Sequence, residues 1–469
     1  MVILSLIPES KAEILAIRKR YPDYYLEYRL DLTSDWSFLD KETVDEHVIL
    51  TLRDRSECSK DVLQKKNISL PDKIKFYCNW IKEFNCLVDI EQSVLHRISI
   101  PELLKLSSNN LIISIHIHDY DWNVADLARR CLEIERSECR YTKLALASNS
   151  WMKLQGLETL IRTTGSQVLV AFMGDDGVSK RCFYRHIGAE GTYVSLKNRA
   201  TVNGQMDIEQ AETLGLKNIS GVDLIGGIIG GKQVVYSEGL EYYNKLFRKK
   251  LLNAVYLPLI INDIHDFHSW LHSGNRMDYL YGFSITMPYK AEIAALAGRE
   301  GETANLWDGG IMILNTDLKA MNQILRENMK PGETGKILLL GSGASANTVL
   351  QATAGKAKVT ICSRNFPAAI ELAKKYKAKY VIAENLRGRH FDILINTTPL
   401  GANNEDLLEF AAGVNFDTAI DLPYRTGGTP LGRYCQANGK KYMSGQEFWI
   451  YQSKPQENFF LAAIHDKDK

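Results

Sequence analysis

Two lysines in this sequence stand where a charged side chain could do chemistry. Lys143 interrupts the apolar run TKLALA (142–147), and Lys290 follows a proline in GFSITMPYK (282–290). A lysine that points into an apolar interior loses water, which favours the neutral amine, and that form can attack a ketone. We therefore expect Lys143 to be a nucleophile. Lys290, taken alone, is more typical of a solvated surface charge.

A glycine-rich turn gives Lys290 a chemical context. The segment 336–364 has the pattern of a strand, a turn, a helix from Ala344 and a second strand, which is typical of dinucleotide binding. Gly341 permits the tight turn, and Gly343 lets the backbone approach a pyrophosphate at the start of the helix. A hydride carrier is therefore expected in this half of the chain.

The end of the second strand indicates which dinucleotide binds. An NAD site has an acidic residue here for the ribose hydroxyls, whereas this chain has Ser363 and Arg364. An arginine fork fits a 2′-phosphate, so NADP is favoured over NAD. Asp317, in the string NTD (315–317), is by itself a common cap before a helix, expected here from Leu318. Beside a hydride acceptor, Lys290 and Asp317 make a plausible pair for proton transfer.

Eight short apolar runs alternate with helical patterns in the first 215 residues, as in a (β/α)₈ TIM barrel. The runs are Val2–Ile7, Tyr24–Leu32, Val48–Arg53, Cys86–Glu91, Leu111–Ile117, Tyr141–Ala147, Gln167–Met173 and Thr192–Leu196. The active site of such a barrel lies at the C-terminal strand ends. The polar residues expected there, besides Lys143, are Glu27, Arg29, Asp31, Arg53, Asp89, Glu91, His116 and His118. Any one of them alone is better explained by a paired charge inside the barrel.

The whole chain favours small-molecule partners. Its 469 residues suggest two to four domains, and 57 Lys+Arg against 56 Asp+Glu leave no general field for nucleic acid or anionic membranes. The eight cysteines lack metal spacing and argue against a zinc site and a secreted disulfide framework, which favours reduced thiols in the cytoplasm. No apolar run approaches 18 residues, and the opening MVILSLIP is typical of a core strand, not of a targeting segment.

Several strings of the first half, taken together, resemble the type I 3-dehydroquinate dehydratases. They occur in the family's order: EYRLD (27–31), LRDRSE (52–57), DIE (89–91), HDY (118–120), Lys143, MGDDGVSKR (173–181) and NGQ (203–205). The resemblance implies that Lys143 forms an imine with the substrate ketone, that His118 moves the proton, and that Glu57 orients or tunes the histidine. It implies substrate contacts for Glu27, Arg29, Arg53, Arg181, Thr201 and Gln205. His116 is a departure, since the family usually has serine there.

The second half is similar to shikimate dehydrogenase. Its strings are GFSITMPYK (282–290), AN (304–305), NTD (315–317), SR (363–364), INTTPLG (395–401), IDLPYR (420–425), TPL (429–431) and GQEFWIYQ (445–452). The resemblance implies that Lys290 and Asp317 act in catalysis. It implies substrate contacts for Ser237, Thr286, Asn305 and Gln452, and cofactor contacts for Gly341, Gly343, Ala344, Ser363, Arg364, Thr397, Thr398 and Pro399. Gly239 and Ser284 replace a family serine and asparagine, which leaves room for a related acid such as quinate.

Both resemblances together predict a bifunctional enzyme with a two-lobed α/β second half. The expected domains are a dehydratase barrel (1–215), a substrate-binding domain (219–317) joined by the C-terminal helix (446–465), and a Rossmann-like NADP domain (318–445). The barrel would dehydrate 3-dehydroquinate, and the second half would reduce 3-dehydroshikimate to shikimate with NADPH. Two alternatives are a metabolite sensor without turnover and an imine-forming aldolase fused to another dehydrogenase.

Overall fold

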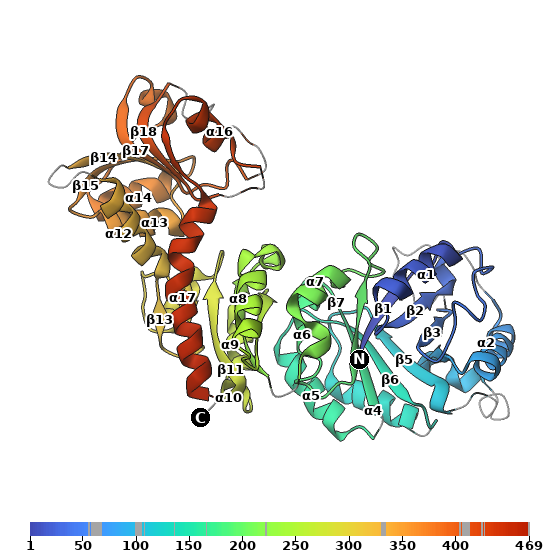
Figure 1. Ribbon diagram of the computed structural model, residues 1–469. Helices are drawn as coiled ribbons and strands as arrows, with labels where there is room; N and C mark the ends of the chain where they lie inside the picture. The colour runs from blue at the N-terminus through green and yellow to red at the C-terminus, as the bar shows by residue number, and fades with distance from the viewer. Residues whose placement is uncertain are drawn as a thin grey trace. The chain divides into compact units, whose positions relative to one another are not determined.

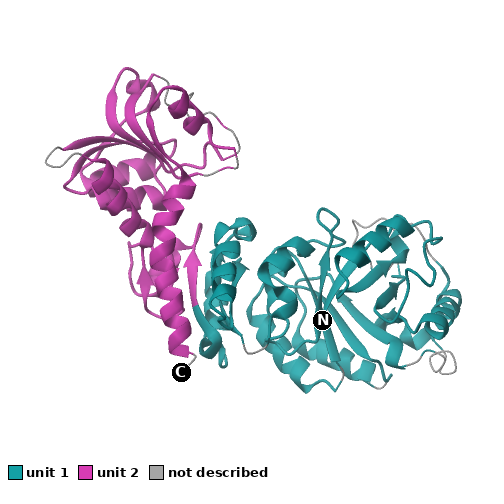
Figure 2. Ribbon diagram, viewed as in Figure 1, with its two compact units in different colours: residues 1–281 teal, residues 282–469 magenta. Residues whose placement is uncertain are grey.

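The computed structural model divides the chain into two compact units, Met1–Tyr281 and Gly282–Lys469 (Figure 2). It describes all residues except 55–56, 58–67, 99–105, 107, 136, 166, 221–222, 330–333, 403–404, 406–412, 424, 426 and 468–469. Among the residues that it describes, no helix has the length and apolar character needed to span a membrane.

Eight parallel strands close into a barrel in the first unit, with the helices outside it (Figure 1). The strands are β1 (Val2–Leu6), β2 (Tyr25–Arg29), β3 (Val48–Thr51), β4 (Leu87–Glu91), β5 (Leu111–Ile117), β6 (Tyr141–Ala147), β7 (Gln167–Met173) and β8 (Gly191–Ser195). Each lies within or beside one of the eight apolar runs, so the predicted barrel is confirmed. Closure leaves the strands without free edges and gathers their C-terminal ends around one mouth.

Helices between the strands have clear local causes. Helix α1 begins after Ser10, whose side chain accepts a hydrogen bond from the N–H of Glu13, and α7 begins with a capping box between Asp207 and Gln210. Helix α2 ends at Asn85 in the left-handed conformation. The barrel helices are α1 (Lys11–Arg20), α2 (Leu70–Phe84), α4 (Val124–Glu135), α5 (Met152–Thr163), α6 (Gly177–Cys182) and α7 (Ile208–Leu214).

The first unit extends beyond the barrel to Tyr281. Its later elements are β9 (Leu224–Gly230), α8 (Glu238–Lys249), β10 (Ala254–Ile260), α9 (Ile264–Leu271) and α10 (Arg276–Tyr279). They are fastened to the barrel by hydrogen bonds and aromatic contacts. The backbone N–H of Ile260 donates to the hydroxyl oxygen of Ser179 at 2.8 Å. Trp151 and Trp270 lie with ring centroids 4.9 Å apart.

The second unit contains a six-stranded parallel sheet of order β16-β15-β14-β17-β18-β19. The strands are β14 (Gly335–Leu340), β15 (Ala357–Cys362), β16 (Lys379–Tyr380), β17 (His390–Asn396), β18 (Asn415–Asp421) and β19 (Lys441–Met443). Ile337 and Leu339 enter one apolar cluster, whereas Leu338 and Leu340 enter another. Both faces of β14 are therefore buried, which explains its unbroken apolar run. The dinucleotide pattern of the sequence corresponds to β14, α13 (Ala344–Thr353) and β15.

Lys290, the lysine of GFSITMPYK, lies at the start of one of the remaining helices of this unit. Strand β11 (Leu280–Ile285) contains the boundary between the units, and its second part pairs antiparallel with β12 (Leu306–Trp307), which pairs with β13 (Ile313–Leu314). The helices are α11 (Lys290–Leu296), α12 (Thr316–Asn328), α14 (Phe366–Tyr376), α16 (Pro430–Ala437) and α17 (Gly445–Lys467). Helix α17 packs against α12.

Candidate active sites

Lys143 lies inside the barrel between two carboxylates. Its Nζ donates to Glu27 Oε1 at 2.7 Å and to Asp89 Oδ2 at 2.9 Å, and it lies 4.2 Å from the centre of the Tyr193 ring. The lysine is 4% exposed. The two buried carboxylates therefore hold the amine in place inside the barrel. An amine attacks a carbonyl carbon in its unprotonated form.

Strand alternation places this cluster. Lys143 lies two residues from Tyr141 and from Ala145, which both belong to the barrel's interior core, so its side chain also points inward. Short hydroxyl side chains on neighbouring strands complete the carboxylates' hydrogen bonds. Ser5 donates to Glu27 Oε2 at 2.6 Å, and Ser114 donates to Asp89 Oδ1 at 2.6 Å.

Arg53 supplies the second positive charge of the cluster. Its guanidinium donates to both oxygens of Asp89, at 3.3 and 3.1 Å. Burial would raise the pKa of Asp89, but Arg53 and Lys143 outweigh burial and hold that pKa well below its usual range. In the same way, burial would raise the pKa of Glu27, yet Lys143 and Arg29 lower it. Both carboxylates are therefore charged at neutral pH.

Two histidines at the end of β5 share Glu57 as a neighbour. His116 Nδ1 lies 3.6 Å from Glu57 Oε2, whereas His118 Nε2 donates to the backbone carbonyl of Glu57 at 3.1 Å. The rings are nearly parallel, with 21° between their planes and 6.5 Å between centroids. Burial, followed by the charge of Arg53, lowers the pKa of His116 well below 6.5. His116 is therefore neutral at pH 7, and its side chain is 7% exposed, while His118 is exposed.

Arg181 is held with one nitrogen still available. Its Nε donates to the carbonyl of Phe172 at 2.9 Å and its Nη1 to that of Tyr193 at 2.6 Å, while Nη2 makes no hydrogen bond within the described part of the chain. Burial lowers the pKa of Arg181 to about 9, since no carboxylate pairs with it directly. An anionic group of a ligand would supply the missing partner.

One cavity brings together every barrel residue that the first resemblance implies. Its lining comprises Ser5, Glu27, Arg29, Arg53, Glu57, His116, His118, Lys143, Ala145, Ala171, Met173, Arg181, Tyr193, Thr201, Val202 and Gln205. Arg29 donates two hydrogen bonds to the carboxylate of Asp31, and Gln205 accepts from the N–H and hydroxyl of Thr201. Asp31 follows β2 in a short 3₁₀ turn (Leu30–Leu32) instead of lying on the strand.

Tyr193 and Ser114 were not singled out by the sequence reasoning, although both contact the cluster. The available signal was strand parity: Tyr193 is an inward position of the eighth apolar run, and Ser114 lies two residues before His116. Parity alone does not say which inward residues meet a lysine on another strand.

A second lysine centre lies in the second unit. Lys290 Nζ donates to Asp317 Oδ2 at 2.6 Å, and the side-chain amide of Asn305 donates to Asp317 Oδ1 at 2.9 Å and to Gln452 Oε1 at 3.2 Å. The structure thus brings together four expected residues from α11, α12, α17 and the segment before β12. Asn315 caps α12 by accepting the N–H of Leu318, so the helix begins at Thr316, two residues before the expected start, and Asp317 lies in its first turn.

A buried chain of polar side chains supports this centre from α17. Ser284 donates to Gln456 Oε1 at 2.8 Å, and Gln456 Nε2 donates to the hydroxyl of Thr316 at 3.1 Å. The same hydroxyl accepts from Asn305 at 2.8 Å. Gln456 was not expected from the sequence, although Gln456 lies one helical turn after Gln452 and hence on the same face of the helix. Ser284, noted as a departure, is thus occupied by a partner from the C-terminal helix.

Two further expected substrate residues have local roles. Ser237 caps α8 by accepting the N–H of Gly239 at 3.3 Å. A Cβ at Gly239 would lie 3.3 Å from the Tyr256 ring, so a larger residue there would press on that ring. Thr286 follows directly after β11, and its carbonyl accepts the N–H of Tyr289 at the start of α11.

The glycine-rich turn has the shape that a dinucleotide requires. Gly341 has φ +111°, and a Cβ there would lie 2.5 Å from Thr397 Oγ1, so only glycine fits. A Cβ at Gly343 would meet nothing within 4 Å, which leaves open space in front of α13. Helix α13 begins at Ala344 without a side-chain cap, so its first N–H groups are available to phosphates.

The residues around this turn fit the same ligand. Thr397 donates to the carbonyl of Leu340 at 2.7 Å, which fixes the loop that continues through Thr398 and Pro399. Ser363 and Ser342 share a hydrogen bond of 2.9 Å, and Arg364 is exposed at the end of β15. The turn, the loop and the arginine therefore suit a phosphorylated dinucleotide.

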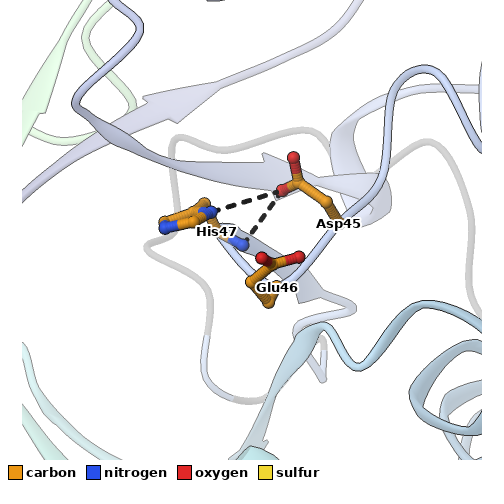
Figure 3. Close-up of side chains that lie close together, drawn as sticks. All are labelled: Asp45, Glu46 and His47. Carbon is orange, nitrogen blue, oxygen red and sulfur yellow. Dashed lines mark hydrogen bonds and ion pairs between the residues drawn. The ribbon is translucent and has the colours of Figure 1, made fainter.

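A surface cluster near β3 places three possible metal-binding side chains together (Figure 3). Asp45, Glu46 and His47 have ligand-type atoms within 4.8 Å of one another. Asp45 is already engaged, because it forms an ion pair with Arg18 and accepts the backbone N–H of His47 at 3.0 Å. Its local contacts explain the arrangement, and we assign it no catalytic part.

Comparisons with known proteins give sequence matches for both halves of the chain. Residues 9–217 match the family model of the type I 3-dehydroquinases. A shikimate dehydrogenase (NADP(+)) of Leptospira interrogans is 28% identical over 249 residues, which cover 47% of this chain and 83% of that protein. A chloroplastic bifunctional 3-dehydroquinate dehydratase/shikimate dehydrogenase of Arabidopsis thaliana is 24% identical over 391 residues, 76% of this chain and 64% of that protein. A solved structure titled dehydroquinate dehydratase and shikimate dehydrogenase from S. pombe AroM aligns over 100% of this chain and 98% of that chain, with 15% identity and a TM-score of 0.39.

Proposed function

We propose that this chain, whose residues 9–217 form a type I 3-dehydroquinase domain, is a bifunctional enzyme of the shikimate pathway. The barrel dehydrates 3-dehydroquinate to 3-dehydroshikimate, and the second half reduces 3-dehydroshikimate to shikimate with NADPH. The observation that carries the proposal is Lys143 inside a cavity with every other barrel residue that the resemblance implies. The relatives in the comparisons, a shikimate dehydrogenase and a bifunctional protein, support the second activity.

In the barrel, Lys143 gives up a proton and attacks the ketone carbon, and loss of water leaves an imine. Protonated imine nitrogen withdraws electrons, so a neighbouring C–H becomes acidic. A histidine at the end of β5, assigned by sequence to His118, removes that proton and protonates the departing hydroxyl. Arg181 pairs with the substrate carboxylate through its available Nη2. Glu27, Arg29 and Arg53 hold polar groups of the substrate, and hydrolysis of the imine frees Lys143.

Thr201 and Gln205 close the mouth of this site. They are already joined, since Gln205 accepts from both the N–H and the hydroxyl of Thr201. Glu57 orients the histidines, as it contacts one ring through its carboxylate and the other through its carbonyl.

In the second unit, Lys290 donates a proton to the carbonyl oxygen of 3-dehydroshikimate and Asp317 holds the lysine in place. Asn305, Thr286 and Gln452 bind substrate hydroxyls. NADPH, when bound, supplies the hydride that reduces the carbonyl carbon. We assign residues 1–215 to the dehydratase barrel, residues 219–317 and the C-terminal helix (446–465) to substrate binding, and residues 318–445 to cofactor binding.

The cofactor is held by groups from three segments. Gly341, Gly343 and Ala344 would receive its pyrophosphate, Ser363 with Arg364 would receive the 2′-phosphate, and the loop of Thr397, Thr398 and Pro399 would also contact it. No disulfide joins the seven described cysteines, which supports a cytoplasmic location.

The two activities can be separated by single substitutions in the full chain. With 3-dehydroquinate and NADPH, we expect the wild type to form shikimate, Lys143→Ala to form no product, and Lys290→Ala to accumulate 3-dehydroshikimate. Supplying 3-dehydroshikimate should restore shikimate formation to Lys143→Ala. Lys75→Ala and Lys319→Ala, at exposed positions on α2 and α12, serve as matched controls. Loss of both activities in both variants, or of neither, would contradict the assignment.

A further inference from the structure

The dehydratase cavity contains an imidazole that the proposed mechanism does not use. His116 lines the same cavity as Lys143, and its side chain is 7% exposed. Its Nδ1 makes no hydrogen bond within the described part of the chain. A buried polar nitrogen without a partner is costly and rarely retained without a task.

The strand register places His116 nearer to Lys143 than His118. Ser114 pairs with Lys143 across β5 and β6, and His116 pairs with Ala145, so His116 lies one inward position beyond the lysine. His118 follows the end of β5 by one residue, and it lies two inward positions beyond Lys143. At about 3.3 Å per residue, these offsets are about 6.6 and about 13 Å along the strand. The first imidazole that a group bound to Lys143 meets on β5 is therefore His116.

Glu57 is placed to stabilise a proton on His116. Its Oε2 lies 3.6 Å from His116 Nδ1, slightly longer than a hydrogen bond. If the ring takes a proton on Nε2, its Nδ1–H faces a carboxylate that can approach and pair with the imidazolium, as the aspartate does in a catalytic triad. Before that, burial and the charge of Arg53 keep His116 in the neutral form that a base needs.

We propose that the two proton transfers of the dehydration are divided between two histidines, with His116 taking the proton from carbon and His118 protonating the departing hydroxyl. This inference rests on the proposed dehydratase function and refines its general base. The C–H bond breaks toward Nε2 of His116, and its electron pair moves through the carbon skeleton to the imine nitrogen. The electron pair then returns from the nitrogen to form the C=C bond as the C–O bond breaks, and the hydroxyl takes a proton from the protonated His118 and leaves as water.

The cycle balances because the proton gained by His116 equals the proton lost by His118. His118 is exposed at the mouth and recovers its proton from solvent, while His116 returns its own through the same opening. No oxidant or further reactant is needed. The ring centroids are 6.5 Å apart, and both imidazoles line the same cavity.

The test compares His116→Asn with His118→Asn in the full chain, using 3-dehydroquinate that carries deuterium at the position of the lost proton. We expect His116→Asn to lower the dehydratase kcat by about 10²- to 10⁴-fold and to stop deuterium washout from unreacted substrate. His118→Asn should slow product formation to a similar extent but retain the washout. Borohydride trapping at Lys143 should persist in both variants, and dehydrogenase turnover checks their folding.

Two results would contradict the division of the proton transfers between His116 and His118. One is a His116→Asn enzyme with kcat within about twofold of the wild type; the other is washout that persists in His116→Asn and is lost in His118→Asn. His116→Ser, which introduces the serine usual in the resembling family, repeats the test with a smaller side chain. If even the wild type traps no imine on Lys143, the proposed dehydratase function itself fails, and that result is distinct from a normal wild type with an unaffected His116 variant.

Discussion

Lys143 Nζ lies 2.9 Å from Oδ2 of Asp89, a carboxylate that is buried completely and that Arg53 also holds. The carboxylate of Asp89 therefore pairs with two buried cations. The arrangement holds the Lys143 amine in a fixed position inside the barrel, and it makes the barrel's stability depend on charges of the proposed active site.

Removing the charge of Asp89 should therefore weaken the barrel. Asp89→Asn preserves the shape but leaves Arg53 and Lys143 with one buried counterion fewer, and we expect a loss of about 3 to 5 kcal/mol in unfolding free energy. Denaturant titration, with hydrogen exchange to assign the barrel transition, measures the loss. Asp126→Asn, on the exposed face of α4, should change it by less than about 0.5 kcal/mol. Equal stability of the two variants would show that the shared carboxylate contributes little.

Gln456 should matter for shikimate turnover although it was not expected from the sequence. It joins Ser284 to Thr316, whose hydroxyl in turn holds Asn305. Gln456→Ala leaves these buried groups without a partner, at a cost of about 1 to 3 kcal/mol, and we expect kcat/KM for shikimate to fall about tenfold. Gln446→Ala, at an exposed position of the same helix, is the control. An unchanged kcat/KM would mean that the polar chain does not position Asn305.

The arginine after β15 should decide between the two dinucleotides. Arg364→Ala removes the cation expected at the 2′-phosphate, so the Kd of NADPH should rise by about 10- to 100-fold, which corresponds to one charged hydrogen-bonded contact. The Kd of NADH should change by less than about twofold. Titration of cofactor fluorescence measures both constants. Equal losses for NADPH and NADH would contradict the assignment of Arg364.

Acid should destabilise the first unit through its buried histidines. Burial is the largest cause that lowers the pKa of His186, which is 4% exposed and lies 2.9 Å from the carbonyl of Asp223. The unfolded chain protonates this ring near pH 6.5, whereas the folded chain protonates it only at lower pH. Its contribution to stability is therefore complete above pH 6.5 and is lost as the pH falls below that value, by about 1.4 kcal/mol per pH unit until the folded pKa is reached.

His186→Gln tests this dependence. Unfolding free energies measured between pH 7.5 and about 5 should fall less steeply for His186→Gln than for the wild type. His465→Gln, at an exposed position of α17, should follow the wild-type curve. A parallel curve for His186→Gln would indicate that another group controls the acid sensitivity.

The strands and the inward residues could be predicted from the sequence because they depend on local order. Eight apolar runs separated by helical patterns determine a barrel, and alternation determines that Lys143 points inward. The partners of those residues could not be predicted, because they come from strands that are distant in sequence. Tyr193 beneath Lys143, and Glu57 beside His116, are examples.

The end of the first compact unit had no sequence signal either. No composition change marks Tyr281, because the boundary falls inside strand β11. The segment that follows the barrel is fastened to it by contacts such as the hydroxyl of Ser179 with the N–H of Ile260, which only the folded chain brings together.

The most direct test of the account is chemical trapping of the imine. The full chain is incubated with 3-dehydroquinate and reduced with borohydride, and peptide mapping by mass spectrometry locates the label. We predict one substrate adduct, on Lys143, and no adduct in Lys143→Ala. A label on another lysine, or an undiminished label in Lys143→Ala, would contradict it.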